Sequence, residues 1–138
     1  TPIKSSAASD VYKRQVEYRL ELAAPEIVFP LHRSYVSLLV RELLKNAVKF
    51  TEQGSVTVEC GLTEPGTLTL SVTDTGCGVE PGLAERVFDR FYKVDPFAQG
   101  LGLGLSLCRL IAEKLGGTIG LDTTYTGGAR FVVTLRDT

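Results

Sequence analysis

The chain has 138 residues, and its 15 lysines and arginines against 16 aspartates and glutamates leave a formal net charge of −1. With 43% hydrophobic and 22% charged residues, the composition is that of one ordinary globular domain and excludes a disordered chain. A nearly neutral chain offers no basic field for a nucleic-acid backbone, so DNA and RNA are not expected partners.

The first fifteen residues differ in composition and hydrophobic patterning from the rest of the chain. They are small and polar and show no sustained helical or strand period. We predict that residues 1–15 are a disordered or linker extension, derived either from a cloning vector or from a native interdomain linker. A single domain is then expected over residues 16–138.

Two strands and a long helix are predicted next. VEYRLEL alternates apolar and polar residues from Val16, and EIVF follows Ala24-Pro25, so two short strands joined by a turn are expected. In residues 34–50 apolar side chains recur at three- and four-residue steps, which predicts an amphipathic helix. Ser34 is its expected N-cap, and the helix should stop near Thr51.

A hairpin and a glycine-rich turn follow. SVTVECGL and TLTLSVTD are alternating, β-branched runs separated by TEPG, which predicts a hairpin that ends at Asp74. Gly76 and Gly78 then mark a turn, and Pro81 favours a short helix through residue 88. Residues 91–100 contain proline and glycine without a period and are expected to form a loop.

The C-terminal part predicts one more helix and two strands. LSLCRLIAEKL has helical spacing and is followed by Gly116-Gly117, which ends the helix. TIGLDT and ARFVVTL are then expected as strands on either side of a glycine turn. Three helices with a sheet built largely from hairpins imply an α+β fold, a two-layer α/β sandwich.

The sequence also limits the environment that we expect. No apolar run approaches the roughly 18 residues of a membrane span, and the N-terminus lacks a signal-peptide pattern, so we expect a soluble chain with no direct membrane contact. Cys60, Cys77 and Cys108 show no CxxC spacing, and they support neither a zinc site nor a disulfide framework. A reducing cytoplasm is the expected location.

One face of the predicted helix over residues 34–50 carries polar chemistry. Glu42, Asn46 and Lys49 stand at i, i+4 and i+7, which places them on one face beside the apolar stripe. An amide oxygen can ligate Mg²⁺, a lysine can meet a phosphate, and a carboxylate can orient or deprotonate a water. The alternative is a solvated helix face without a ligand.

Two glycine-containing segments are candidates for ligand contact. DTGCGV places Asp74 at a strand end, where it can accept a hydrogen bond from an exocyclic amine or only cap its own turn. GLGLGLSLC places glycines directly before a helix, so that backbone N–H groups can converge on an anion. This run matches neither the dinucleotide fingerprint nor a P-loop, and a glycine hinge without a ligand is the alternative.

The segment RVFDRFYK supplies aromatic residues and cations. Phe88 and Phe91 can pack a mobile loop against the domain, with Arg90 and Lys93 near whatever that loop covers, or they can simply be core residues. His32 has no acidic neighbour and no second histidine. It is therefore expected to be a capping or surface residue.

Four of these segments occur in an order that is typical of one family. RELLKNAVKFT, DTGCGV, RVFDRFYKVD and GLGLGLSLCRLIAEKLGGTI resemble the N box, first glycine box, F box and second glycine box of bacterial sensor histidine kinases. From Val16 to Leu135 the chain resembles their catalytic and ATP-binding domain, of the GHKL superfamily. This implies the Bergerat ATP-binding fold: a mixed, mainly antiparallel sheet with three helices on one face and a short ATP lid.

The resemblance also implies roles for individual residues. Asn46 would coordinate Mg²⁺ on the phosphates, Glu42 would hold or polarise a water near the metal, and Lys49 would contact phosphate. Asp74 would accept the adenine amine. The other ATP-binding residues would be Gly76 and Gly78 beside the base, Phe88 and Phe91 as lid anchors, Lys93, and Gly100, Leu101, Gly102, Leu103, Gly104 and Leu105 around the phosphates.

Two features depart from the family pattern. Leu101 stands where many members have threonine, which removes a side-chain hydrogen bond from the lid but leaves the backbone donors. The phospho-accepting histidine of the family, which lies in a separate helical hairpin domain upstream, has no match here. His32 lies 14 positions before Asn46, inside the ATP-binding domain itself.

The expected function is thus that of the catalytic module of a two-component histidine kinase, which binds Mg-ATP but cannot complete autophosphorylation alone. Its expected partners are the dimerisation and histidine phosphotransfer domain of the same kinase and, through the full-length kinase, a response regulator receiver domain. We expect it in the cytoplasm, in a parent protein that can be anchored in the inner membrane. The alternatives are another GHKL ATPase, a serine kinase of the anti-sigma type, or a non-catalytic ATP-sensing docking module.

Overall fold

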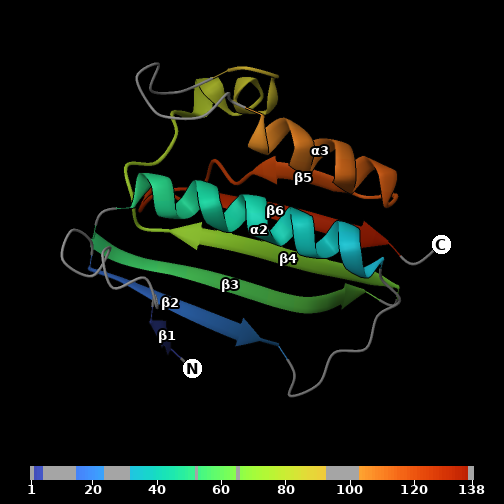
Figure 1. Cartoon of the computed structure of the whole chain (residues 1–138), viewed down its shortest axis with the longest axis horizontal. Coiled ribbons are helices and arrows are strands. Elements are labelled where there is room, and N and C mark those ends of the chain that lie inside the picture. Colours follow the sequence, from blue (N-terminus) through green and yellow to red (C-terminus); the bar gives the residue numbers. More distant parts are fainter. Residues whose placement is uncertain are drawn as a thin grey trace.

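The computed structural model describes residues 2–4, 15–23, 32–51, 53–64, 66–92 and 103–136. These residues form two layers, with a twisted sheet on one side and two α-helices packed on one of its faces (Figure 1). The α+β sandwich expected from the sequence is therefore confirmed. The C-terminal ends of the long helix and of the strand that ends at Asp74 lie at the same end of the sheet.

The sheet has six strands in the order β1-β2-β3-β4-β6-β5. The pairing of β2 with β3 is parallel, and the other neighbouring pairs are antiparallel, so the sheet is mixed and mainly antiparallel as expected. The strands are β1 (Pro2–Lys4), β2 (Gln15–Leu22), β3 (Gln53–Glu64), β4 (Thr67–Asp74), β5 (Thr118–Leu121) and β6 (Arg130–Arg136).

The N-terminal boundary of the sheet differs from the predicted one. Pro2–Lys4 pairs antiparallel with β2, and β2 starts at Gln15, so some of residues 1–15 belong to the sheet. The second short strand that we expected, EIVF, lies outside the described residues. Disorder is therefore not observed at Pro2–Lys4 or Gln15, and the assignment of residues 1–15 to a linker or added extension stays a prediction.

The long helix α2 spans Arg33–Phe50. The prediction of Ser34 as its N-cap is wrong, because His32 stands at the N-cap position and its carbonyl accepts the N–H of Val36 at 3.0 Å. Ser34 thus lies in the first turn. His32 makes no side-chain capping bond and is exposed, which agrees with a surface histidine at the start of a helix.

The predicted short helix through residue 88 is also wrong. Two 3₁₀ turns occupy this stretch, η1 (Pro81–Leu83) and η2 (Arg86–Phe88), so the described residues contain two α-helices rather than three. A segment this short gains too few hydrogen bonds to offset helix nucleation, and Gly82 lowers its helix propensity further. The tighter i→i+3 turns are the usual result.

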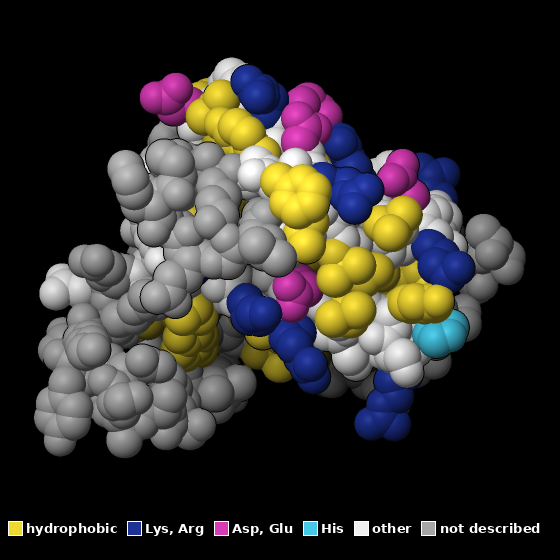
Figure 2. Space-filling view, turned by 45° about the horizontal axis from the view of Figure 1, so that its top comes forward, with side chains coloured by type: hydrophobic (Ala, Val, Ile, Leu, Met, Phe, Trp, Pro, Cys, Tyr) yellow, Lys and Arg dark blue, Asp and Glu magenta, His cyan; other side chains and the backbone are white. Residues whose placement is uncertain are grey.

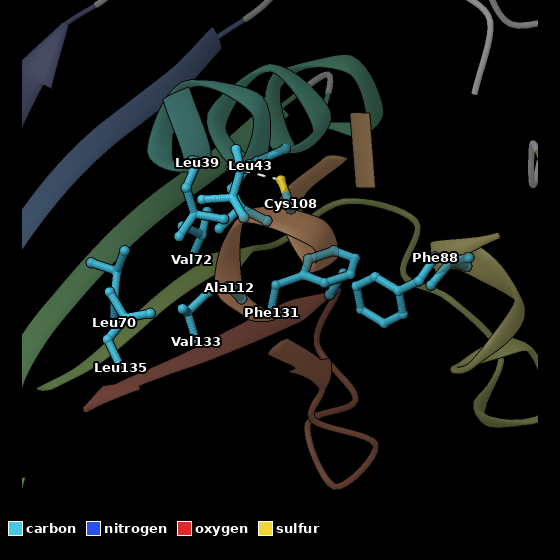
Figure 3. Packing of buried hydrophobic residues seen from close by; sticks show 14 of the residues in the cluster. Leu39, Leu43, Leu70, Val72, Phe88, Cys108, Ala112, Phe131, Val133 and Leu135 are labelled. Atoms are coloured by element: carbon cyan, nitrogen blue, oxygen red, sulfur yellow. Dashed lines mark hydrogen bonds between the residues drawn. The ribbon is translucent and has the colours of Figure 1, made fainter. Parts of the chain in front are cut away.

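The core lies between the helices and the sheet (Figure 3). Leu39 and Leu43 of α2 and Cys108 of α3 (Gly104–Lys114) have no exposed surface, and they face apolar residues of β4 and β6. The thiol of Cys108 donates to the carbonyl of Leu39 at 3.8 Å, which ties the two helices together. This packing fixes the axis of α2 against the sheet and hence the position of its C-terminal end.

Candidate functional site

Asp74 is a buried carboxylate at the C-terminal end of β4, with 2% of its surface exposed. Its Oδ1 atom accepts the N–H of Gly76 at 2.9 Å and the N–H of Ala129 at 3.1 Å. Its own N–H donates to the carbonyl of Ala129 at 2.8 Å. Asp74 therefore caps its own turn, as one alternative from the sequence predicted, and it is also bound to Ala129, the residue before β6.

The environment of Asp74 disfavours its charge. Burial raises the pKa of this carboxyl group, and the two backbone N–H donors offset only part of that effect. Among the described residues no hydrogen bond reaches Oδ2, because both donors use Oδ1. The second oxygen is left as an acceptor for a group from outside the described structure.

A second set of contacts fixes Asp74 from the other side of the sheet end. The hydroxyl of Tyr125 donates to the carbonyl of Asp74 at 3.2 Å, and the Arg130 guanidinium lies 4.4 Å from the centre of the Tyr125 ring. Arg130 Nε donates to Thr73 Oγ1 at 3.1 Å, and Nη1 lies 3.4 Å from Asp122 Oδ2. No local sequence pattern indicates this network, because it joins residues more than fifty positions apart.

The turn after Asp74 requires glycine for two different reasons. Gly78 has a φ of +74°, a conformation that residues with a side chain rarely adopt. A Cβ atom at Gly76 would collide with the carbonyl oxygen of Phe50 and stand 2.9 Å from Thr51 Oγ1. The turn backbone therefore lies directly against the C-terminal end of α2.

Hydrogen bonds hold this turn on two sides, and one polar group beside it has no partner. Thr75 N–H donates to the Ser55 carbonyl at 3.1 Å, and Ser55 N–H donates to Thr75 Oγ1 at 3.0 Å. On the side of α2, Cys77 N–H donates to the Phe50 carbonyl at the longer distance of 3.4 Å. Thr51 Oγ1 is fully buried without a hydrogen-bond partner among the described residues, which typically costs about 1–3 kcal/mol.

Of the three residues on the predicted polar face of α2, Glu42 lies against the start of α3. The Glu42 side chain is 15% exposed and lies 3.4 Å from Lys45 Nζ. A Cβ atom at Gly104 would stand 3.3 Å from Glu42 Oε1, so the carboxylate lies against the first residue of α3. Asn46 is half-buried and Lys49 is exposed, with its Nζ 5.6 Å from the centre of the Phe50 ring.

The charge of Glu42 affects the buried thiol of Cys108 in α3. The pKa of the Cys108 thiol is raised to about 12, chiefly by burial and then by the nearby Glu42 carboxylate. Lys45, which was not among the predicted site residues, partly balances this charge from the position three residues later on α2. The i, i+3 spacing of Glu42 and Lys45 is a signal that could have identified the pair.

The N-terminus of α3 presents backbone donors at the same place. Gly104 and Leu105 lie in its first turn, whose N–H groups have no partner within the helix, and Leu103 stands at the N-cap position. Gly100, Leu101, Gly102 and Lys93 lie outside the described residues. The structure therefore brings Glu42 together with Gly104. The prediction that residues 100–102 and Lys93 join them around a phosphate is not tested.

The two predicted lid anchors lie in different environments. Phe88 is buried and packs edge to face on Phe131, with ring centres 5.9 Å apart, so it belongs to the core. Phe91 is 62% exposed and has a φ of +65°. Arg109 of α3 holds this segment through a 2.8 Å ion pair with Glu85 and through its contact with the Phe88 ring.

The described residues also form a cavity of about 240 Å³ between the turn after β4 and the β5–β6 connection. Cys77, Glu80, Leu121, Asp122 and Tyr125 are among its lining residues, and Asp74 and Glu42 are not. The cavity therefore lies beside the turn that carries Asp74 and apart from the polar face of α2.

Two kinds of feature are absent from the part of the chain that the structure describes. The described residues contain no group of three or more histidine, cysteine, aspartate or glutamate side chains placed to hold a metal ion. No helix among them is both long and apolar enough to cross a membrane.

Comparisons with known proteins match most of the chain. The family model described as "Histidine kinase-, DNA gyrase B-, and HSP90-like ATPase" matches residues 32–138. The sensor protein IrlS of Burkholderia pseudomallei is 45% identical over 86 residues, which are 59% of this chain and 18% of that protein. The sensor protein SrrB of Staphylococcus aureus is 36% identical over 102 residues, or 70% of this chain and 17% of that protein.

Solved structures agree with the sequence matches. Full-length ShkA in complex with AMPPNP superposes with a TM-score of 0.82 at 27% identity, covering 93% of this chain and 27% of that one. The mycobacterial sensor histidine kinase MprB gives a TM-score of 0.76 at 26% identity, covering 93% of this chain and 83% of the other. The chain spans less than a fifth of the length of IrlS and SrrB.

Proposed function

This chain belongs to the histidine kinase-, DNA gyrase B- and HSP90-like ATPase family, as an ATP-binding domain of the sensor-kinase type, and we propose that it positions Mg-ATP for transfer of the γ-phosphoryl group to a histidine on a separate domain. The observation that carries this proposal is the buried Asp74 carboxylate, tied at Oδ1 to two backbone N–H groups.

Asp74 supplies the recognition of the base. An ionised carboxylate only accepts hydrogen bonds, so Oδ2 suits the exocyclic amine of adenine and not the carbonyl that guanine carries at that position. A base without an amine at this position would leave the buried acceptor unpaired, and such unpaired polar groups discriminate strongly against the wrong ligand. Gly76 and Gly78 let the turn pack directly against the backbone of Phe50 and Gly128, and we propose that this fixed turn is the surface on which the flat base lies.

Glu42, Asn46 and Lys49 supply the groups for the phosphates. Glu42 lies against the N-terminus of α3, so a phosphate bound to the first-turn N–H groups of α3 would meet a carboxylate unless a cation stood between them. The half-buried amide of Asn46, one turn after Glu42, offers the neutral oxygen that Mg²⁺ accepts. We assign Asn46 as the protein ligand, Glu42 to a water on the metal, and Lys49 to a phosphate oxygen.

Mg²⁺ fits this donor set. It keeps several waters and is commonly bound through one or two protein groups together with substrate phosphates, which agrees with the small number of acidic ligands in the described part of the chain. Bound there, it would neutralise charge that develops on the transferred phosphoryl group. Leu103, Gly104 and Leu105 would add backbone donors, and the same role for Gly100, Leu101, Gly102 and Lys93 is a prediction from the sequence.

The phosphoryl acceptor is assigned to another domain because of where His32 lies. His32 stands at the opposite end of α2 from Thr51, and an α-helix rises about 1.5 Å per residue, so some 20 Å of helix separates it from Asn46. In the proposed reaction the bond between the γ-phosphorus and the bridging oxygen breaks, a histidine nitrogen bonds to phosphorus, and ADP leaves. His32 cannot reach that position.

The helical layer offers a surface for the histidine-bearing domain. Hydrophobic side chains gather on this face and are bordered by lysine and arginine side chains (Figure 2). Leu110 of α3 is 63% exposed and Leu103 is also exposed, close to the end of the site that would hold the phosphates. We propose that the dimerisation domain docks here, that a response regulator acts through the full-length kinase, and that the domain works in the cytoplasm, where ATP is available.

Titration of the purified domain with Mg-ATP tests the proposal. We expect one site by calorimetry, and at about 100 times Kd the nucleotide should stabilise the domain by roughly 2.7 kcal/mol. The Asp74→Asn variant should lose most of this binding, and a metal-free titration should bind more weakly than the Mg²⁺ titration. Absence of nucleotide binding by the wild-type domain would contradict the proposal and favour a docking module.

A further inference from the structure

Thr51, directly after α2, has a buried hydroxyl group that the proposed site does not yet use. The inference drawn from it rests on the proposed function. Thr51 follows the last residue of α2, its surface is completely buried, and its hydroxyl oxygen has no hydrogen-bond partner among the described residues. Buried hydroxyl groups are nearly always paired, so an unpaired one calls for a physical explanation. The oxygen itself has no exposed surface, which rules out direct contact with a ligand in this arrangement.

The hydroxyl lies beside the backbone that carries the base-reading carboxylate. The position where a Cβ of Gly76 would stand is 2.9 Å from Thr51 Oγ1, so only the missing side chain of Gly76 leaves space between them. The N–H of Gly76 donates in turn to Asp74 Oδ1 at 2.9 Å. A small displacement of the turn toward α2 would therefore act on both the threonine and the carboxylate.

The turn is bound firmly to the strands and loosely to α2. Asp74 and Thr75 are bonded to Ser55 of β3 and to Ala129, just before β6, at 2.8–3.1 Å, whereas the bond from Cys77 N–H to the Phe50 carbonyl of α2 measures 3.4 Å. Backbone hydrogen bonds have their most common length near 2.9–3.0 Å, so this contact can still shorten by a few tenths of an ångström. The unpaired hydroxyl stands on the same loose side.

We propose that Thr51 is a positioning residue of the base site, whose hydroxyl donates to a turn carbonyl of residues 75–77 when the turn closes on adenine. The bond forms only in the bound arrangement, so it adds to affinity without adding to the stability of the free domain. It also joins the base site to α2, whose preceding turns carry Asn46 and Glu42.

Two substitutions of Thr51 separate this role from a purely structural one. Thr51→Val keeps the shape and removes the hydroxyl, and Thr51→Ser keeps the hydroxyl. For Thr51→Val we expect an unchanged or higher Tm of the free domain and an ADP affinity about tenfold weaker, which equals about 1.4 kcal/mol. The loss should be equal with and without Mg²⁺, because it arises at the base, and Thr51→Ser should restore binding. Thr57→Val on β3 is the matched control and should change neither quantity.

The outcomes distinguish this inference from the proposed function. If the wild-type domain binds ADP, Asp74→Asn abolishes binding and Thr51→Val binds normally, the inference is overturned and the proposed function stands. A Tm lowered by Thr51→Val and restored by Thr51→Ser, with affinity following the folded fraction, would also overturn it by showing an ordinary structural bond. If the wild-type domain itself binds no ADP, both ideas are contradicted.

Discussion

Asp74 is the residue at which ligand binding and stability make opposite demands. In the proposed site its ionised form accepts the adenine amine, whereas burial raises the pKa of the carboxyl group and so disfavours that form in the folded domain. The folded domain binds the proton more tightly than the unfolded chain does. The tighter proton binding adds to the free energy of unfolding when the pH is below 3.8, the ordinary pKa of an aspartate. This stabilisation is lost as the pH rises through the pKa of Asp74 in the folded domain.

Asp74→Asn should therefore not destabilise the free domain at neutral pH. The amide oxygen can still accept the N–H groups of Gly76 and Ala129, and the buried charge is gone. We expect a Tm equal to or above that of the wild type at neutral pH, with the difference shrinking as the pH falls toward 3.8. Thermal unfolding across this pH range measures it, and a variant less stable than wild type at neutral pH would show that the charge itself is needed for folding.

Asn46→Asp tests the metal end of the site. The new carboxylate would stand four residues after Glu42, where two like charges repel on a helix, and it would also face the phosphates. We expect ADP to bind roughly tenfold, or about 1.4 kcal/mol, more weakly in the presence of Mg²⁺, and to lose at least as much affinity without the metal, because no cation then stands between the new carboxylate and the phosphates. Calorimetry with and without Mg²⁺ checks this. Unchanged phosphotransfer in a reconstituted kinase would remove Asn46 from its assigned role.

At the scale of elements, the segment after the glycine turn is attached to the domain through one aromatic ring. Phe88 packs on Phe131 of β6 and under Arg109 of α3, so it joins η2 to both layers. Phe91, three residues later, contributes its ring to the surface. Two phenylalanines three residues apart in the sequence therefore contribute differently to the stability of the domain.

Alanine substitutions of the two phenylalanines should differ clearly. Phe88→Ala leaves a hole between the layers and should lower the free energy of unfolding by about 3–5 kcal/mol. Phe91→Ala should change it by no more than about 0.5 kcal/mol, as is usual for exposed positions. Urea unfolding measures both. Equal losses for the two variants would mean that Phe91 is buried in solution.

The elements also show what sequence reasoning can predict and what it cannot. The apolar stripe of α2 and the end of β4 at Asp74 follow from local periodicity, which one segment carries by itself. The N-cap and the 3₁₀ turns differ from expectation because competing local signals, Ser34 and Pro81, were weighed without their tertiary surroundings. Thr51, Tyr125 and the contact of Glu42 with Gly104 depend on distant segments and have no local signature.

At the scale of the whole molecule, the described residues supply the groups of the proposed nucleotide site, and the one histidine of the chain lies at the other end of α2. The polar ends of α2, β4 and α3 are the proposed nucleotide site, and the apolar part of the helical face is the proposed docking surface. The two surfaces meet near the start of α3. A nucleotide bound at one can therefore be presented to a domain bound at the other.

Leu110→Glu should separate binding from transfer. Leu110 is 63% exposed and takes no part in the core, so the variant should keep the stability and the ATP affinity of the wild type. A charge in the docking surface should lower phosphotransfer to a supplied histidine-bearing domain by at least about tenfold, since desolvating it costs more than about 1.4 kcal/mol. Radiolabelled transfer in trans measures this. Lys114→Glu, at the end of the same helix, tests whether any acidic residue on α3 has the effect.

The parallel pairing of β2 with β3 has a consequence for the order in which the sheet assembles. The β3–β4 and β5–β6 pairs are hairpins that close over short loops, but β2 can join β3 only after the whole of α2 has crossed over the sheet. Such a long connection closes late, because its entropy is lost before its contacts are gained. We expect β2 to be the last long strand to dock and the first to open, so its amide hydrogens should exchange with solvent faster than those of β4 and β6.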